Sequence, residues 1–199
     1  MRGRKLWIVG IVALALISVV ACFGLRQYQQ MKRLAAFQAL IREGSGQAES
    51  ILGALSSEDS IPPGKIQPEC EKSVQERREL IEKVAASDMS NVAELQTEYI
   101  ALLTAENDLI MKIGAAQNDV VYEASRIEQE SVEEECSLAR MTMEDNAKVR
   151  DKANNVLALE QKFKEACARH GLTCEPTFAK YGKFMSDSFE AREMPYHCR

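Results

Sequence analysis

The stretch NVAELQTEYIALLTAENDLIMKIGAAQNDVVYEASRI, residues 91–127, decides the fold. Its apolar residues recur in alternating steps of three and four, the heptad spacing of a helix that packs along another helix. The pattern holds if Glu106 and Glu123 each occupy one seam position, and the other seam residues are Val92, Leu95, Tyr99, Leu102, Leu109, Ile113, Ala116, Val120 and Ile127. The spacing predicts a long helix whose apolar face seeks a partner.

Beyond Ile127 the apolar residues fall out of the heptad spacing. A second series of apolar residues at helical spacing follows and ends near His170. One helix over residues 91–170 would be about 120 Å long, which is suspicious for a compact domain. We therefore expect a break at residues 145–146 or 154–155, or a kink at Gly114. The expected fold class is all-α, with an antiparallel helical bundle or coiled coil.

The segment before the heptad also has helical spacing. Residues 27–55 carry two apolar clusters separated by a weak point at residues 44–46, and the prolines at 62–63 end this helix. A second helix is expected from Pro68 to about Ser87, after which Asn91 and Glu94 form a capping box for the heptad helix.

The C-terminal part follows a well-marked helix end. Gly171 lies where a left-handed C-cap residue belongs, just after His170. The remaining piece, residues 176–199, is amphipathic and predicts a cap that folds back on the bundle. The expected organisation is a membrane segment over residues 1–25, a helical body over 26–175 and this cap.

The N-terminal segment predicts attachment to a membrane. Residues 6–25 contain no charge and follow Arg2, Arg4 and Lys5. A helix of this length is about 30 Å long, the thickness of a bilayer's hydrocarbon core, and Trp7 suits its interface. The segment therefore predicts an uncleaved single-pass signal anchor.

An alternative is a lipoprotein signal peptide. Residues 19–22, Val-Val-Ala-Cys, resemble the bacterial lipobox. This resemblance implies that Cys22 is lipidated and becomes the mature N-terminus. The body would then be lipid-anchored in the cell envelope.

Charge and cysteine content bear on location and partners. Beyond the first 25 residues the chain has 22 Lys and Arg against 30 Asp and Glu, a formal charge of −8, which argues against nucleic acid as a partner. Five of the six cysteines follow the apolar run and fit an oxidising compartment. We therefore expect the body to lie outside the cytoplasm.

Cysteine spacing predicts two disulfides. Cys167 and Cys174 flank the helix end and can pair across the turn. The tail after Pro176 can retreat along the preceding helix by about 24 Å as helix and about 20 Å more if extended, which makes Cys136 and Cys198 the second pair. Cys70 is left as a free thiol or as an intermolecular bridge in a dimer.

The same residues admit a rival prediction of a zinc site. Cys167, His170 and Cys174, together with His197 and Cys198, are five nitrogen and sulfur ligands of the type that zinc prefers. Disulfides are the favoured alternative because the spacing is not a standard paired-cysteine motif. The sequence assigns no metal and no other cofactor.

No motif indicates an enzyme. The chain lacks the G-x-S-x-G, H-E-x-x-H and Walker-type patterns, and its acidic runs are typical of solvated helix faces. The expected function is a membrane-tethered, extracytoplasmic interaction or scaffold protein that self-associates or docks to another envelope protein. Alternatives are a periplasmic ligand-sensing bundle and a lipoprotein accessory subunit of a secretion or lysis system, because the layout is loosely similar to inner-membrane spanins and secretion accessory subunits.

Overall fold

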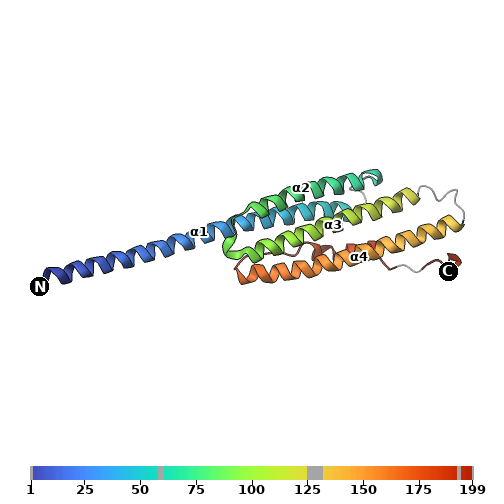
Figure 1. The fold of residues 1–199 in the computed structure, drawn as a ribbon. Helices are drawn as coiled ribbons and strands as arrows, with labels where there is room; N and C mark the ends of the chain where they lie inside the picture. The colour runs from blue at the N-terminus through green and yellow to red at the C-terminus, as the bar shows by residue number, and fades with distance from the viewer. Residues whose placement is uncertain (1, 58–60, 125–131, 192–193, 199) are drawn as a thin grey trace.

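The computed structural model describes residues 2–57, 61–124, 132–191 and 194–198, with the side chains of 2–20, Pro63, Asn91 and 120–124 left out. Within this part the chain forms helices and no strand. Four long helices run up and down beside one another as an antiparallel bundle, and the first projects far beyond the others (Figure 1). The all-α prediction is confirmed.

The first helix, α1 (Arg2–Ser56), is continuous over 55 residues. The weak point expected at residues 44–46 does not interrupt it. Only its C-terminal part belongs to the bundle, and its buried residues there recur at helical spacing: Phe37, Ile41, Ala48, Ile51, Leu52 and Leu55. Packing of this stripe stabilises the helix and offsets the low helix propensity of its glycines.

The next two helices follow short 3-10 turns. After the prolines come η1 (Pro63–Lys65) and α2 (Ile66–Ala86), so α2 begins two residues before the expected Pro68. Then η2 (Ser90–Val92) leads into α3 (Ala93–Ala124). Asn91 lies inside η2 rather than at the N-cap of α3, which corrects the predicted helix start.

The long helical region turns between α3 and α4 (Val132–Arg169). The breaks predicted at residues 145–146 and 154–155 lie inside α4, and Gly114 lies inside α3, so these predictions are wrong. Tertiary contacts hold the polar pair within the helix, because Asp145 accepts a hydrogen bond of 2.6 Å from Lys112 on α3 and Asn146 is buried. The end of α3 at Ala124 and the start of α4 at Val132 lie on either side of the position where the apolar residues fall out of the heptad spacing.

The heptad face of α3 forms the centre of the bundle. Its described seam residues are buried, Glu106 among them: Val92, Leu95, Tyr99, Leu102, Glu106, Leu109, Ile113 and Ala116. Val120, Glu123 and Ile127 lie outside the described side chains. Because α2 and α4 both pack on α3, its heptad face packs against helices of the same chain.

The C-terminal segment covers the bundle as predicted. Gly171, just past the end of α4, has a φ of 69° and makes the left-handed C-cap. Then η4 (Phe178–Tyr181) and α5 (Gly182–Ser188) bury Phe178, Met185 and Phe189. A last turn, η5 (Tyr196–Cys198), returns to the start of α4.

In the part of the chain whose side chains are described, no helix is long and apolar enough to cross a membrane. Most of the predicted anchor, residues 6–25, lies outside that part. The continuation of this segment into the bundle as one helix is shown, whereas its insertion in a membrane stays a prediction.

Candidate functional site: an interaction groove and its polar support

The structure joins the two predicted cysteine pairs. Cys136 in the first turns of α4 is bonded to Cys198 in η5, with their Cα atoms 5.2 Å apart. Cys167 is bonded to Cys174 across the turn after α4, with a Cα separation of 6.3 Å. The first bond holds the C-terminal tail against the start of α4. The second links the end of α4 to the segment that follows it.

The five-residue zinc site is wrong. Cys136 and Cys167 lie 31 positions apart on one helix, about 46 Å, so His197 and Cys198 cannot reach Cys167, His170 and Cys174. The structure instead gathers Cys136, His197 and Cys198, whose candidate ligand atoms all lie within 4.8 Å of one another. The predicted Cys136–Cys198 pair already implied this grouping, because His197 precedes Cys198 in the sequence.

Cys70 is a free thiol in the core, 1% exposed, at the contact between α2 and α3. A Cβ at Gly114 would lie 2.8 Å from the Cys70 sulfur, so Gly114 permits this close approach. Burial raises the pKa of the Cys70 thiol to about 11, and the neighbouring Glu69 and Glu71 add to the effect. Of the two predictions for Cys70, this position favours the free thiol over the intermolecular bridge.

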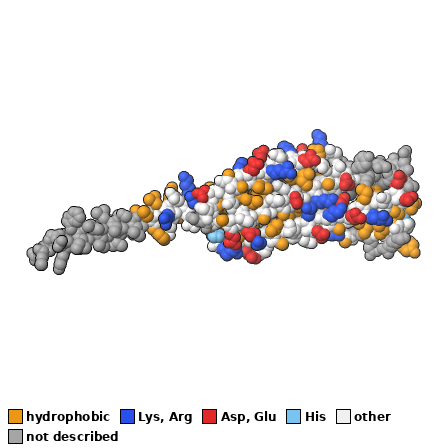
Figure 2. All heavy atoms as spheres, viewed as in Figure 1, with side chains coloured by type: hydrophobic (Ala, Val, Ile, Leu, Met, Phe, Trp, Pro, Cys, Tyr) orange, Lys and Arg blue, Asp and Glu red, His pale blue; other side chains and the backbone are white. Residues whose placement is uncertain are grey.

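Cys22 lies on the exposed stretch of α1 outside the bundle. Its neighbours along the helix are exposed apolar residues: Phe23, Leu25, Tyr28 and Met31. Figure 2 shows these side chains in orange between the undescribed N-terminal atoms and the bundle. Lipidation of Cys22 stays a prediction.

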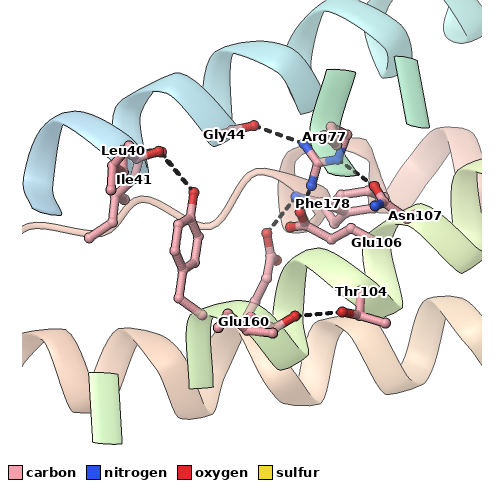
Figure 3. Close-up of polar contacts among 11 residues, drawn as sticks. Leu40, Ile41, Gly44, Arg77, Thr104, Glu106, Asn107, Glu160 and Phe178 are labelled. Carbon is pink, nitrogen blue, oxygen red and sulfur yellow. Dashed lines mark hydrogen bonds and ion pairs between the residues drawn. The ribbon is translucent and has the colours of Figure 1, made fainter. Parts of the chain in front are cut away.

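A buried arginine joins three helices near the middle of the bundle. Arg77 on α2 is 0% exposed and pairs with Glu106 on α3. Its Nε donates to Asn107 Oδ1 and its Nη1 donates to the Gly44 carbonyl on α1, both at 2.9 Å (Figure 3). Burial lowers the pKa of Arg77 to about 10, still well above neutral pH, so the guanidinium keeps its charge.

Sequence reasoning missed Arg77 as a core residue. The sequence signal was an interruption in the apolar stripe of α2. Val74 and Leu80 lie on the same helix face on either side of position 77, where the stripe has an arginine. The matching signal on α3 was Glu106 in a seam position. A buried charge requires an oppositely charged partner and satisfied hydrogen bonds. The charged residue in the apolar stripe of α2 and the one in the seam of α3 therefore indicated an ion pair between Arg77 and Glu106.

Tyr99 connects α3 with α1 next to this network. Its hydroxyl donates to the Leu40 carbonyl at 3.1 Å, and its ring stacks on Phe163 of α4 at 4.8 Å between centroids. Burial raises the pKa of Tyr99. A Cβ at Gly44 would collide with the Tyr99 hydroxyl, so the glycine at this position lets α1 approach α3.

Glu160 on α4 holds the cap in place. Its carboxylate accepts a hydrogen bond of 2.7 Å from the backbone N–H of Phe178 (Figure 3). It accepts a second one, of 3.1 Å, from the backbone N–H of Ala179. These contacts satisfy the free donors at the start of η4. Burial raises the pKa of Glu160, and the backbone donors oppose the shift.

An open groove of about 500 Å³ lies between α1 and the start of α2. Its α1 side presents small residues one helical turn apart, Gly46, Ser50 and Ala54. Its opposite side presents charges of alternating sign: Lys65, Glu69, Lys72 and Glu76. This groove is a candidate for binding another molecule.

Two observations suggest that the groove is not shaped by the chain's own packing. A Cβ at Gly46 would meet no atom within 4 Å, in contrast to Gly44 two residues earlier. The Gln47 Oε1 atom in the same groove is buried and has no hydrogen-bond partner among the described residues. A buried acceptor of this kind is costly unless a donor reaches it.

Comparisons with known proteins identify no relative of this chain, since neither a family model nor a curated protein nor a solved structure matches it.

Proposed function

We propose that this chain is a membrane-tethered, extracytoplasmic interaction protein that holds a helical bundle next to the bilayer for a protein partner. The observation that carries the proposal is the continuity of α1. One helix contains the uncharged residues 6–25 and, from Phe37 onward, part of the bundle core. The bundle is thereby joined to the anchor without a flexible linker.

The stalk between anchor and bundle supports this arrangement. Leu25 and Leu34, the latter partly buried against the core, are nine residues apart, about 14 Å along a helix. The exposed Phe23 and Tyr28 suit a membrane interface, and Arg26 and Lys32 suit a headgroup region. The bundle would therefore stand close to the membrane surface.

The docking surface in this proposal is the groove between α1 and α2. The heptad face of α3 is unavailable, because it is buried inside the bundle. Small residues on α1 permit close approach of a partner helix, and the alternating charges on η1 and α2 select for one of complementary pattern. The partner is either another envelope protein or a second copy of this chain.

Photo-crosslinking in native membranes tests the groove. A photoreactive residue is placed at Ser50, in the groove, and in a matched control at Asp151, which is exposed on α4. We expect a crosslinked protein adduct from Ser50 and none from Asp151. Equal adducts from both positions, or none from Ser50, would contradict a docking role for the groove.

Membrane attachment is tested separately. We expect the chain to remain with the membrane after alkaline extraction and the body to be cleaved by protease added outside the cytoplasmic membrane. Palmitate labelling of wild type and Cys22→Ser distinguishes a lipid anchor from an uncleaved helix. Label that appears in wild type but not in Cys22→Ser indicates lipidation of Cys22. Release by alkaline extraction without any label would contradict both.

A second candidate function is ligand sensing. The groove volume is within the range of small-molecule sites, and its lysines, glutamates and unpaired Gln47 oxygen suit a polar ligand. A screen of small polar metabolites for a rise in melting temperature separates the candidates. A sensor responds to a ligand and loses the response on Gly46→Leu, whereas a scaffold shows no response.

A further inference from the structure

The Cys136–Cys198 disulfide has a histidine beside it. Cys136 is in the first turns of α4, and His197 and Cys198 are in η5, which the bond holds against that helix. One candidate ligand atom from each of the three residues lies within 4.8 Å of the other two. This is the one group of three or more potential metal ligands found within the described part of the chain.

The chemistry of this group matches a metal that prefers sulfur and imidazole. Zinc binds cysteine sulfur and histidine nitrogen in tetrahedral sites, and three protein ligands leave a fourth position for water. A further carboxylate is in place, because His197 Nε2 lies 3.3 Å from Glu135 Oε1. Carboxylates in this position orient metal-binding histidines and increase their basicity.

We propose that the chain, once this disulfide is reduced, binds one Zn²⁺ through Cys136, His197 and Cys198, with Glu135 orienting His197. The reductant is a dithiol. It transfers two electrons and two protons to the S–S bond, which breaks into two thiols while the reductant forms its own disulfide. Zn²⁺ then displaces the two thiol protons to solvent and binds both sulfurs.

The consequence is that two different bonds can hold the tail in one place. The disulfide ties η5 to α4 when the chain is oxidised. The same residues tie it through zinc when the chain is reduced, because their ligand atoms are already close together. The metal would keep the tail docked under conditions that open the disulfide.

The other disulfide supplies a matched control. Cys167 and Cys174 form a second reducible pair at the opposite end of α4. Their replacement in a Cys167→Ser/Cys174→Ser variant leaves Cys136, His197 and Cys198 unchanged. This variant, together with Cys136→Ser/Cys198→Ser, assigns any zinc to one end of the bundle.

Metal titration of the full chain in detergent micelles tests the proposal. The chain is reduced with dithiothreitol, desalted under argon and titrated with Zn²⁺, and a parallel sample is titrated with Co²⁺ to detect thiolate-to-metal charge transfer. We expect one Zn²⁺ per reduced chain, none per oxidised chain, and an unchanged result for Cys167→Ser/Cys174→Ser.

Three variants locate the ligands. We expect Cys136→Ser/Cys198→Ser to abolish binding, Glu135→Gln to weaken it about 10- to 100-fold, and His197→Ala to weaken it more than Glu135→Gln does. Circular dichroism verifies that each variant keeps its helices. Absence of zinc binding by the reduced wild type, or full binding by Cys136→Ser/Cys198→Ser, would overturn the site, and full binding by His197→Ala would remove the histidine from it.

Hydrogen exchange of the C-terminal peptide gives an independent measurement. In the reduced chain treated with a chelator, residues 194–198 should exchange faster than in the oxidised chain, and Zn²⁺ should restore their protection. Exchange that does not respond to Zn²⁺ would contradict the role of the metal as a second tie.

Discussion

Gly44 and Gly46 are two residues apart on α1 and have opposite surroundings. A Cβ at Gly44 would collide with the Tyr99 hydroxyl and would also meet Leu80 at 3.0 Å. A Cβ at Gly46 would point into the open groove. The first glycine therefore serves packing within the chain, whereas the second meets no atom of the chain's other helices and lowers the helix propensity of α1.

This contrast predicts opposite effects of the same substitution. Gly44→Ala should destabilise the fold because α1 must move away from α3, whereas Gly46→Ala should stabilise it by up to about 1 kcal/mol through helix propensity. Urea unfolding followed by circular dichroism measures both. Similar changes in the two variants would show that α1 does not approach Tyr99 as described.

Glu160 predicts a pH dependence. Its pKa is raised in the folded state, chiefly by burial, so the folded chain holds this proton more tightly than the unfolded chain. Its stabilising contribution is fully present below the unfolded pKa and is lost as the pH rises through the raised value. Between about pH 4 and pH 7, wild type should lose stability relative to Glu160→Gln, which cannot ionise. Parallel unfolding free energies across this range would contradict the shift.

At the scale of elements, Arg77 holds α1, α2 and α3 together. Arg77→Met leaves the Glu106 carboxylate buried without its cation and should cost about 3–5 kcal/mol. The double variant Arg77→Met/Glu106→Leu removes both charges and should recover most of this loss. Urea unfolding of the two variants and of Glu106→Leu alone completes the cycle. Additive effects would mean that the two side chains do not interact.

The two disulfides should differ in their contribution to stability. The Cys167–Cys174 bond spans 7 residues and the Cys136–Cys198 bond spans 62. In the chain-entropy account these loops correspond to about 2.5 and about 4 kcal/mol. We therefore expect Cys136→Ser/Cys198→Ser to lower the unfolding free energy in metal-free buffer more than Cys167→Ser/Cys174→Ser does. The reverse order in urea unfolding would contradict the loop argument.

At the scale of the whole molecule, the burial of Cys70 predicts that the chain forms no covalent dimer through this residue. In a Cys22→Ser background, the chain should run as a monomer on a non-reducing gel. A maleimide should label Cys70 only after unfolding, because the folded thiol is buried and has a pKa of about 11. A disulfide-linked dimer that disappears in Cys70→Ser would show that α2 separates from α3.

Much of the fold could be predicted from local pattern. Apolar spacing predicted the helices, Gly171 marked the end of α4, and the standard helix and strand rises made Cys136 and Cys198 a candidate pair, which the structure joins. The end of α3 and the start of α4 could not be predicted, because the sequence has neither glycine nor proline at residues 125–131. Polar residues near position 145 suggested a break, but contacts from α3 keep them helical.

The sequence by itself determined the helical class, the approximate extent of α2, the end of α4 and the uncharged N-terminal segment, and it offered the two disulfides as candidate pairs. These depend on residue type and spacing within one segment or between neighbouring ones. Only the tertiary structure decided that the heptad face is buried within the chain, that Arg77 meets Glu106, and that a groove opens beside Gly46. The physical reason is that these contacts join residues distant in sequence, and their pairing depends on how all the helices pack together.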